Sequence, residues 1–338
     1  MIRATYGSHE LYTAMAARAL RLWRAHEDRF HTQLLRTTGA LWMFERDDPF
    51  VGISSSTLRR HGLALDSLSV ADARRRYPQI DFTGISSALF EPDAGYLFAR
   101  RACEHVASLF IAEGGEYVEG AAASPVDPGG PVRSMQLADG SKVEADAFVF
   151  ACGPWLGSLF PDLLGGVVQA TRQEVYYFAI PSGDARFSDE RLPVWLELGE
   201  RFIYGIPEAI DAGFKVADDT PGPPIDPTSD PRTPTEAGIR EMRGFLARRF
   251  PDLAGVPLQR AEVCQYESTP DAHFVVDRHP RAGNVWIAGG GSGHGFKMGP
   301  VIGEIVASLV RGRSQVDPAF ALARFASPPE GGWRAKWS

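Results

Sequence analysis

The chain has 338 residues, of which 44% are hydrophobic and 23% are charged, and its formal net charge is −7. These values are typical of a folded globular protein long enough for two domains, so they indicate neither a disordered chain nor a membrane protein. The net negative charge argues against a nucleic-acid partner.

Strands and helices alternate in the first half of the chain without an internal repeat. Residues 8–30 are predicted to form a long helix, with Ser8 as its N-cap and apolar side chains on one face. The other elements predicted here are a helix at 99–113, strands at 37–44, 86–90, 116–119 and 147–152, and a hairpin turn at Asp139-Gly140.

The middle third of the chain is predicted to be mostly strand. Strands are expected at 168–178, 194–198, 202–206 and 260–266, which indicates an antiparallel sheet distinct from the βα segments around it. Residues 218–234 contain six prolines and cannot form a regular element. A solvated connection and a lid both fit that segment. The tail at 327–338 is predicted to be a flexible end.

Targeting and cysteine usage point to the cytoplasm. The sequence has no charged-then-apolar leader and no run of about eighteen apolar residues, so neither a signal peptide nor a membrane span is expected. Three cysteines, Cys103, Cys152 and Cys264, are too few and odd in number for a disulfide scaffold. We therefore expect a cytoplasmic protein.

The segment 284–312 carries the strongest local pattern. A strand is predicted at 284–288 and a helix at 300–310, with five glycines between them: Gly289, Gly290, Gly291, Gly293 and Gly295. Such a turn lets the backbone approach a ligand, and the helix N-terminus favours an anion or an electron-rich carbonyl. The run matches neither standard phosphate fingerprint, so a glycine-rich connection without a ligand is the alternative. His294 and Lys297 inside the turn favour a functional loop.

Residues 292–297, Ser-Gly-His-Gly-Phe-Lys, resemble the C-terminal flavin-binding segment of the monomeric sarcosine oxidase and N-methyl-amino-acid oxidase family, in the D-amino-acid oxidase class of FAD enzymes. Further matches to family motifs lie at Ile2-Arg3 with Tyr6-Gly7, at 38–41, at 91–95, at 151–155 and at 320–325. The resemblance implies an α/β fold with an α+β substrate domain. It assigns 1–36, 99–170 and 273–338 to an incomplete Rossmann-like FAD-binding domain. Residues 37–98 and 171–272 form the substrate domain on a mixed, largely antiparallel sheet.

One part of the family pattern is absent. Members begin with a strand, a G-x-G-x-x-G loop and a helix that hold the FAD pyrophosphate, and Met1 falls after the place where that unit would end. A start assigned too late, a fragment, and a second polypeptide that supplies the unit are the three explanations. We favour the first two, and we expect little FAD uptake by the chain as it stands.

The resemblance implies a covalent flavin. Cys264 and Tyr266 stand in a C-x-Y-x-x-T-x-D pattern in which the family cysteine is joined through sulfur to the 8α carbon of the flavin. The alternative for Cys264 is a small buried hydrophobic residue in a strand. Ser292, His294, Lys297 and the five glycines of the turn, with Gly153 and Trp155, complete the expected cofactor site. His294 either contacts the flavin or caps the turn.

Four residues are expected to act in catalysis. Lys215 matches a family lysine over the flavin that favours electron transfer to oxygen, and Tyr204 matches a tyrosine of the substrate cavity. A surface lysine and a sheet aromatic are the alternatives. Arg3 and Lys297 resemble the pair that binds the substrate carboxylate, although Lys297 could face solvent. A chain that starts at Met1 would leave Arg3 on a loose end.

Asp219 departs from the family, which has a histidine four residues after the lysine. A carboxylate there repels a substrate carboxylate or attracts a cationic amine, so N-methylglycine itself is in doubt as a substrate.

The reaction implied is oxidation of a secondary or cyclic amino acid to an imine. A hydride equivalent would pass to the flavin, and oxygen would be reduced to hydrogen peroxide. A same-fold dehydrogenase that uses a quinone or a partner protein, and a non-catalytic fragment, are the alternatives. No metal site, nucleic acid or membrane is expected.

Overall fold

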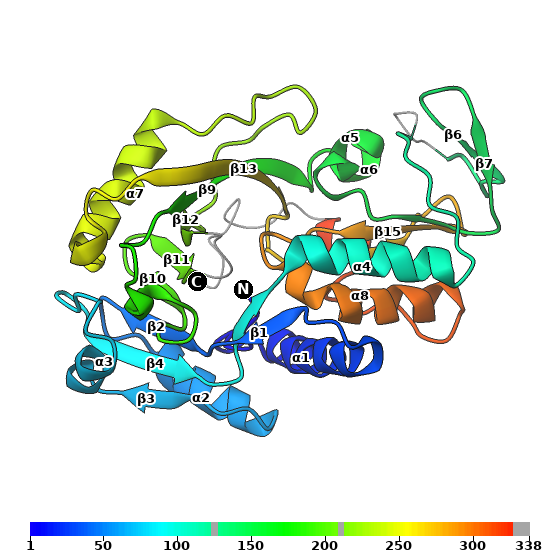
Figure 1. Ribbon diagram of the computed structural model, residues 1–338. Coiled ribbons are helices and arrows are strands. Elements are labelled where there is room, and N and C mark those ends of the chain that lie inside the picture. The colour runs from blue at the N-terminus through cyan, green and yellow to red at the C-terminus, as the bar shows by residue number, and fades with distance from the viewer. Residues whose placement is uncertain (123–127, 209–212, 327–338) are drawn as a thin grey trace.

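The computed structural model describes residues 1–122, 128–208 and 213–326, and the tail expected to be flexible lies outside these ranges. A large mixed sheet and a smaller group of strands and long helices lie side by side (Figure 1). Among the described residues, no helix combines the length and apolar character needed to cross a membrane.

The large sheet has eight strands in the order β13-β9-β12-β11-β10-β2-β4-β3. Only the β10–β2 pair is parallel, and the other neighbours are antiparallel, as the sequence predicts for this region. The strands are β2 (Ala40–Phe44), β3 (Asp66–Leu68), β4 (Ser87–Glu91), β9 (Gln169–Phe178), β10 (Val194–Leu198), β11 (Phe202–Ile206), β12 (Phe214–Asp218) and β13 (Leu258–Ser268).

One face of this sheet packs against helix α7 (Glu236–Arg249). Trp195, Phe214 and Phe245 form part of a buried cluster there, with the Trp195 and Phe245 rings stacked at a centroid distance of 5.7 Å. Arg249 at the end of α7 is buried and pairs with Glu197 of β10, with Nε 2.6 Å from Oε2. Because α7 covers this face, functional side chains of the sheet must lie on the other one.

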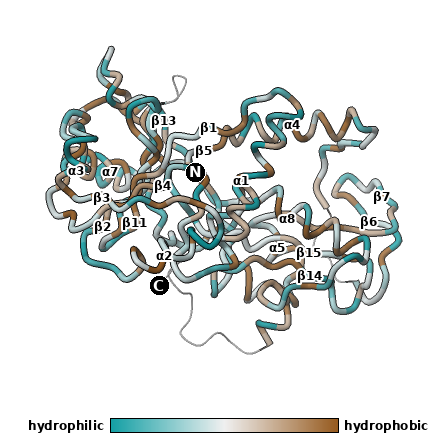
Figure 2. Tube along the Cα trace, turned by 90° about the horizontal axis from the view of Figure 1, so that it is seen from below, coloured by the Kyte–Doolittle hydropathy of each residue, from teal (hydrophilic) through white to brown (hydrophobic). Residues whose placement is uncertain are grey.

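The second group of elements is built around α1 and α8, whose apolar faces pack together with Phe274 and Val276. A small sheet in the order β14-β15-β8 lies beside them (Figures 1 and 2), with β15 and β8 parallel. The bounds are α1 (Glu10–Phe30), α4 (Ala99–Ala112), α8 (Gly295–Val310), β8 (Phe148–Phe150), β14 (Val275–Arg278) and β15 (Val285–Gly289).

The remaining elements are short. They are α2 (Phe50–Arg60), α3 (Val70–Arg76), α5 (Leu156–Leu159), α6 (Pro161–Leu164), β1 (Leu35–Thr37) paired with β5 (Gly95–Leu97), and the hairpin β6 (Ser134–Gln136) with β7 (Lys142–Glu144). The 3-10 turns are η1 (Gly153–Trp155), η2 (Ala185–Phe187), η3 (Pro251–Leu253) and η4 (Leu322–Phe325). The hairpin confirms the turn expected at Asp139-Gly140.

Three local predictions are wrong. Residues 116–119 form no strand, because they have no neighbouring strand to pair with, and Tyr117 is 60% exposed. The strand expected at 37–44 is split at Gly39, whose φ of +76° turns the chain from β1 into β2. Ser8 does not cap α1, since His9 holds the N-cap position without a side-chain cap bond.

Helix α8 also begins earlier than expected. It starts at Gly295 and contains Pro300 in its second turn, so Lys297 lies in the first helical turn and not in the loop. A proline near a helix start is tolerated because it gives up only one hydrogen bond.

The proline-rich segment forms neither helix nor regular strand, as predicted, but it is tied to strand β9. The amide of Arg172 donates to the Pro223 carbonyl at 2.9 Å, and the amide of Ile225 donates to the Ala170 carbonyl at 3.0 Å. Gly222 allows the approach, because a Cβ there would lie 1.7 Å from the Arg172 carbonyl oxygen. The segment therefore extends the sheet beyond the end of β12.

Replacing Thr235 with alanine is expected to lower the free energy of unfolding by about 1 kcal/mol. The Thr235 hydroxyl accepts a hydrogen bond from the Gly238 amide at the start of α7 and donates one to Glu174. Urea unfolding followed by circular dichroism measures the shift. Thr235→Ser keeps the oxygen and should unfold like the unchanged protein; equal shifts for both variants would contradict the capping role.

Candidate active site

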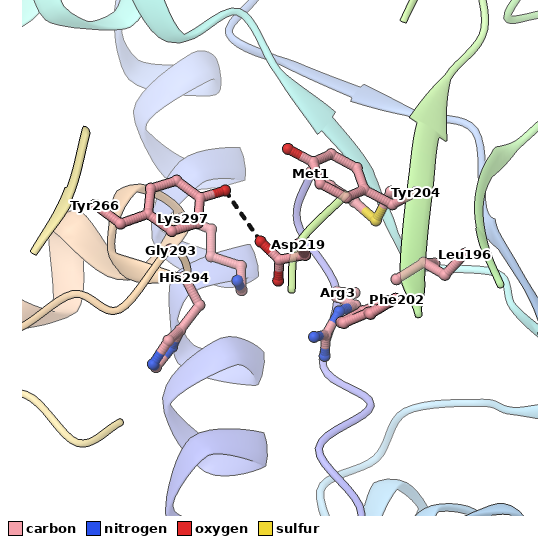
Figure 3. A pocket seen from close by; sticks show the side chains of 10 residues that line it. All are labelled: Met1, Arg3, Leu196, Phe202, Tyr204, Asp219, Tyr266, Gly293, His294 and Lys297. Carbon is pink, nitrogen blue, oxygen red and sulfur yellow. Dashed lines mark hydrogen bonds between the residues drawn. The ribbon is translucent and has the colours of Figure 1, made fainter. Parts of the chain in front are cut away.

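A small cavity of about 70 Å³ lies where the uncovered face of the large sheet meets the N-terminal segment and the start of α8. Figure 3 shows the side chains around it, with the Lys297 ammonium and the Arg3 guanidinium directed into the same space and the Asp219 carboxylate between them. The lining residues are Met1, Arg3, Leu196, Phe202, Tyr204, Asp219, Tyr266, Gly293, His294 and Lys297.

Arg3 is held firmly, contrary to the expectation of a loose end. The carboxylate of Glu91 accepts hydrogen bonds from the amides of Ala4 and Thr5 and from the Thr5 hydroxyl. Ile2 exchanges two backbone hydrogen bonds with Gly95, at 2.8 and 3.0 Å. These contacts fix the segment that carries Arg3, which is only 6% exposed.

The Arg3 guanidinium and the Lys297 ammonium both lie close to the ring of Tyr6. The Arg3 guanidinium lies 4.7 Å from the ring centroid of Tyr6 and 4.7 Å from that of Trp42. The Lys297 ammonium lies 5.6 Å from the same Tyr6 centroid. The Asp219 carboxylate offsets part of the repulsion between these two buried cations, and together the cations can still stabilise a bound anion. The pair expected from the sequence is therefore brought together at this cavity.

Strand register places four further residues on one face. Lys215 of β12 is opposite Tyr177 of β9, and Cys264 of β13 is opposite Gln173 of the same strand. Because Gln173 and Tyr177 are four residues apart, they share a face. The same rule adds Tyr204, which is opposite Ala217, and Tyr266, two residues after Cys264. This is the face that α7 leaves uncovered.

Lys215 lies among aromatic rings and a thiol. Its ammonium is 5.6 Å from the ring centroid of Tyr204 and 5.9 Å from that of Tyr177. Burial lowers the pKa of Lys215, against the opposing charge effects of Cys264, Glu262 and Asp219. Burial raises the pKa of the Cys264 thiol, and the Lys215 charge lowers it. The Lys215 side chain is partly buried on the face of the sheet that α7 leaves uncovered.

Asp219 follows directly after β12 and accepts a hydrogen bond from the Tyr266 hydroxyl at 3.0 Å, drawn dashed in Figure 3. Burial first, and then the Asp219 charge, raise the pKa values of Tyr204 and Tyr266. Both tyrosines therefore stay protonated and can donate hydrogen bonds.

The glycine turn is fixed by its own Ser292 side chain and by residues at and just after the end of β13. The Ser292 hydroxyl donates to the Gly290 carbonyl and accepts from the Thr269 amide, and φ of Ser292 is +43°. The Glu267 carboxylate accepts from the Gly291 amide at 3.2 Å. Asp271 pairs with Arg324 at 2.8 Å, which ties this loop to the C-terminal motif.

His294 holds the N-cap position of α8 but makes no side-chain cap bond. Its Nε2 is 3.1 Å from the Ala272 carbonyl oxygen, and its ring packs 5.0 Å from those of Tyr12 and Phe274. The ring thus positions the turn while it also lines the cavity.

Gly153 and Trp155 do not line the cavity. They form η1, which packs against β13, and the Trp155 indole donates to the Thr228 hydroxyl at 2.9 Å. Their expected contact with a cofactor stays a prediction. Glu91 and Glu267 are site residues that are not among those predicted from the sequence, and the family match at 91–95 was a signal for Glu91.

The donors around the cavity suit an electron-rich ligand. The first turn of α8 has no acidic residue and no side-chain cap, so its amides and dipole favour negative charge. Two cations and two tyrosine hydroxyls line the cavity together with the Asp219 carboxylate, and the Cys264 thiol lies outside this lining on the same face of the sheet. This chemistry fits a carboxylate and the carbonyl-bearing edge of a heteroaromatic ring.

Comparisons with known proteins agree with this chemistry. The family described as FAD dependent oxidoreductase matches residues 1–309. Monomeric sarcosine oxidase of Bacillus sp. (strain B-0618) is 30% identical over 327 residues, which make up 94% of this chain and 82% of that protein. N-methyl-L-tryptophan oxidase of Citrobacter koseri is 28% identical over 331 residues, 96% of this chain and 85% of the relative.

The structure of L-proline dehydrogenase from P. horikoshii superposes with a TM-score of 0.82 at 20% identity, covering 96% of this chain and 86% of that one. This likeness shows the fold alone. The family match and the sequence identity also show the family. The chain is an FAD-dependent oxidoreductase and belongs to the family of the monomeric sarcosine oxidases and N-methyl-amino-acid oxidases.

Proposed function

We propose that this enzyme oxidises the C–N bond of a secondary or cyclic amino acid, with dioxygen as electron acceptor. The observation that best supports this function is that the Arg3 and Lys297 side chains line the same cavity beside the glycine turn. The substrate loses two electrons and two protons to become an imine, which water hydrolyses. Dioxygen takes up the two electrons and two protons to become hydrogen peroxide.

The glycine turn and the first turn of α8, with Cys264 on the uncovered face of the sheet beside the cavity, fit the ring end of FAD. Its carbonyl edge would lie at the first turn of α8, and the Cys264 sulfur would be joined to the ring. When bound, FAD supplies the acceptor for the two electrons of the C–N bond. No G-x-G-x-x-G loop, the usual binding element for the pyrophosphate, occurs in the given sequence. We assign residues 1–36, 99–170 and 273–338 to the domain that binds FAD, and residues 37–98 and 171–272 to the substrate domain.

The residues in and beside the cavity have separate roles. Arg3 and Lys297 bind the substrate carboxylate and hold the α-carbon in a single orientation. Tyr204 and Tyr266 close the cavity from the sheet side. Lys215, on the same face of the sheet, provides positive charge for the reduction of dioxygen. The likeness to sarcosine and N-methyl-L-tryptophan oxidases supports an N-methyl amino acid as substrate.

Amine oxidation by the flavin-loaded full chain tests this function directly. N-methyl amino acids should be consumed with formation of peroxide in equal amount to the oxygen used. Turnover with a quinone but without peroxide would reassign the acceptor. No turnover of any N-methyl or cyclic amino acid by protein with stoichiometric flavin would contradict the function.

Replacing Cys264 with serine is expected to abolish covalent flavin attachment, because a hydroxyl lacks the nucleophilicity of a thiolate. The measurement is flavin absorbance in the protein pellet after acid precipitation. Cys103→Ser is the matched control, since Cys103 is exposed on α4 and away from the cavity. Flavin that stays in the pellet of the Cys264→Ser protein would rule out this linkage, and so would release from the unchanged protein.

A further inference from the structure

A second, larger pocket of about 360 Å³ lies next to the cavity. Three residues, Arg3, Phe202 and Asp219, line both spaces, so the two are neighbours across these side chains. The volume falls in the range of about 300–1,000 Å³ that is typical of small-molecule sites. The inner cavity, at about 70 Å³, has room for little more than a small polar head group.

The wall of this outer pocket is aromatic. Trp42, Phe44 and Phe50 form a contiguous set of rings, with centroid distances of 5.7 Å between Trp42 and Phe50 and 6.0 Å between Phe44 and Phe50. Phe202 adds a fourth ring at the junction with the inner cavity. Aromatic walls of this kind favour a planar apolar group in offset or edge contact.

The charges around the outer pocket balance. Arg46 and Arg201 carry positive charge, and Asp48 and Glu200 carry negative charge. Arg201 is already paired with Asp218 and Glu241. The rim therefore offers no net charge to select an ionic side chain, and the aromatic wall is the main source of discrimination.

The junction fixes the orientation of a ligand that spans both spaces. Arg3 is stacked on Trp42 of the outer wall while its guanidinium reaches the inner cavity. A carboxylate held by Arg3 and Lys297 would therefore lie beside this boundary, and the rest of the ligand could extend into the outer pocket. Asp219, on the same boundary, disfavours a second carboxylate there.

We propose that the outer pocket receives the side chain or the nitrogen substituent of the substrate, and that this group is aromatic. This inference rests on the proposed function and narrows its substrate class to amino acids with an aromatic group, at the expense of N-methylglycine.

Relative turnover tests the proposal. With the flavin-loaded full chain, kcat/KM for N-methyl-L-phenylalanine or N-methyl-L-tryptophan should exceed that for N-methylglycine by about 10–200-fold, the range for added apolar groups in a fitting pocket. Thr220→Trp should lower this ratio about tenfold, because Thr220 is exposed and lines the outer pocket. Thr233→Trp is the control, since Thr233 is exposed and lines neither space. A ratio near one would overturn the proposal.

Binding without turnover separates this proposal from the proposed function. Calorimetry should show phenylacetate binding at least about tenfold more tightly than acetate, with the difference lost in Thr220→Trp. That result supports the pocket even if no amine is oxidised. Oxidation of amines together with equal binding of both acids would sustain the function and overturn the aromatic pocket.

Discussion

The Lys215→Met enzyme is expected to reoxidise its flavin about 10²–10³-fold more slowly in air than the unchanged enzyme. Lys215 lies on the uncovered face of the sheet, close to Tyr177 and Tyr204. Negative charge develops on dioxygen as the first electron arrives, and a fixed positive charge nearby stabilises it. Methionine has a similar length without the charge. Stopped-flow mixing of the reduced enzyme with oxygenated buffer measures the rate.

The pH dependence gives a second readout of the same residue. Burial lowers the pKa of Lys215, so its ammonium is lost at a lower pH than that of an ordinary lysine. The charge is present below the lowered pKa and absent above it. Reoxidation should therefore slow as pH rises through that value, and Lys215→Met should lack this step.

Lys142→Met is the matched control, because Lys142 is exposed on the β6–β7 hairpin. Its reoxidation should equal that of the unchanged enzyme. Anaerobic flavin reduction by substrate should remain measurable in Lys215→Met, since the carboxylate pair is untouched. Equal reoxidation rates for Lys215→Met and Lys142→Met would mean that oxygen is not the acceptor or that it reacts elsewhere.

Local pattern predicts the parts of this site that lie close together in the sequence. The glycine turn, His294 and Lys297 are within nine residues, and β15 and α8 flank them as expected. The predicted start of α8 is several residues too late. A proline is common in the first position of a helix, whereas Pro300 lies inside α8.

Long-range pairing explains most of what the sequence could not predict. Glu91 fixes Arg3 by binding amides at positions 4 and 5, more than eighty residues away, and no periodicity encodes such a bond. Lys215 and Cys264 share a face only because β9 lies between their strands. The resemblance to a family predicts Lys215 and Cys264 as separate site residues. The register of the sheet gives the physical reason why they lie on the same face.

The Lys297→Met enzyme is expected to lose about 10²–10³-fold in kcat/KM for N-methyl amino acids, since one of two cations facing the substrate carboxylate is removed. Arg3 remains in place, because Glu91 and Gly95 hold its segment independently of Lys297. The backbone of position 297 also remains, so the bond from the Trp23 indole to its carbonyl is kept.

The comparison that isolates the carboxylate uses two substrates that differ only in that group. An N-methyl amino acid should suffer the full loss, whereas the corresponding N-methylamine without a carboxylate should be affected by no more than about threefold. Lys297→Arg retains a cation and should recover part of the activity. If Lys297→Met slowed both substrates equally, Lys297 would position the flavin or the turn, and Arg3 alone would bind the carboxylate.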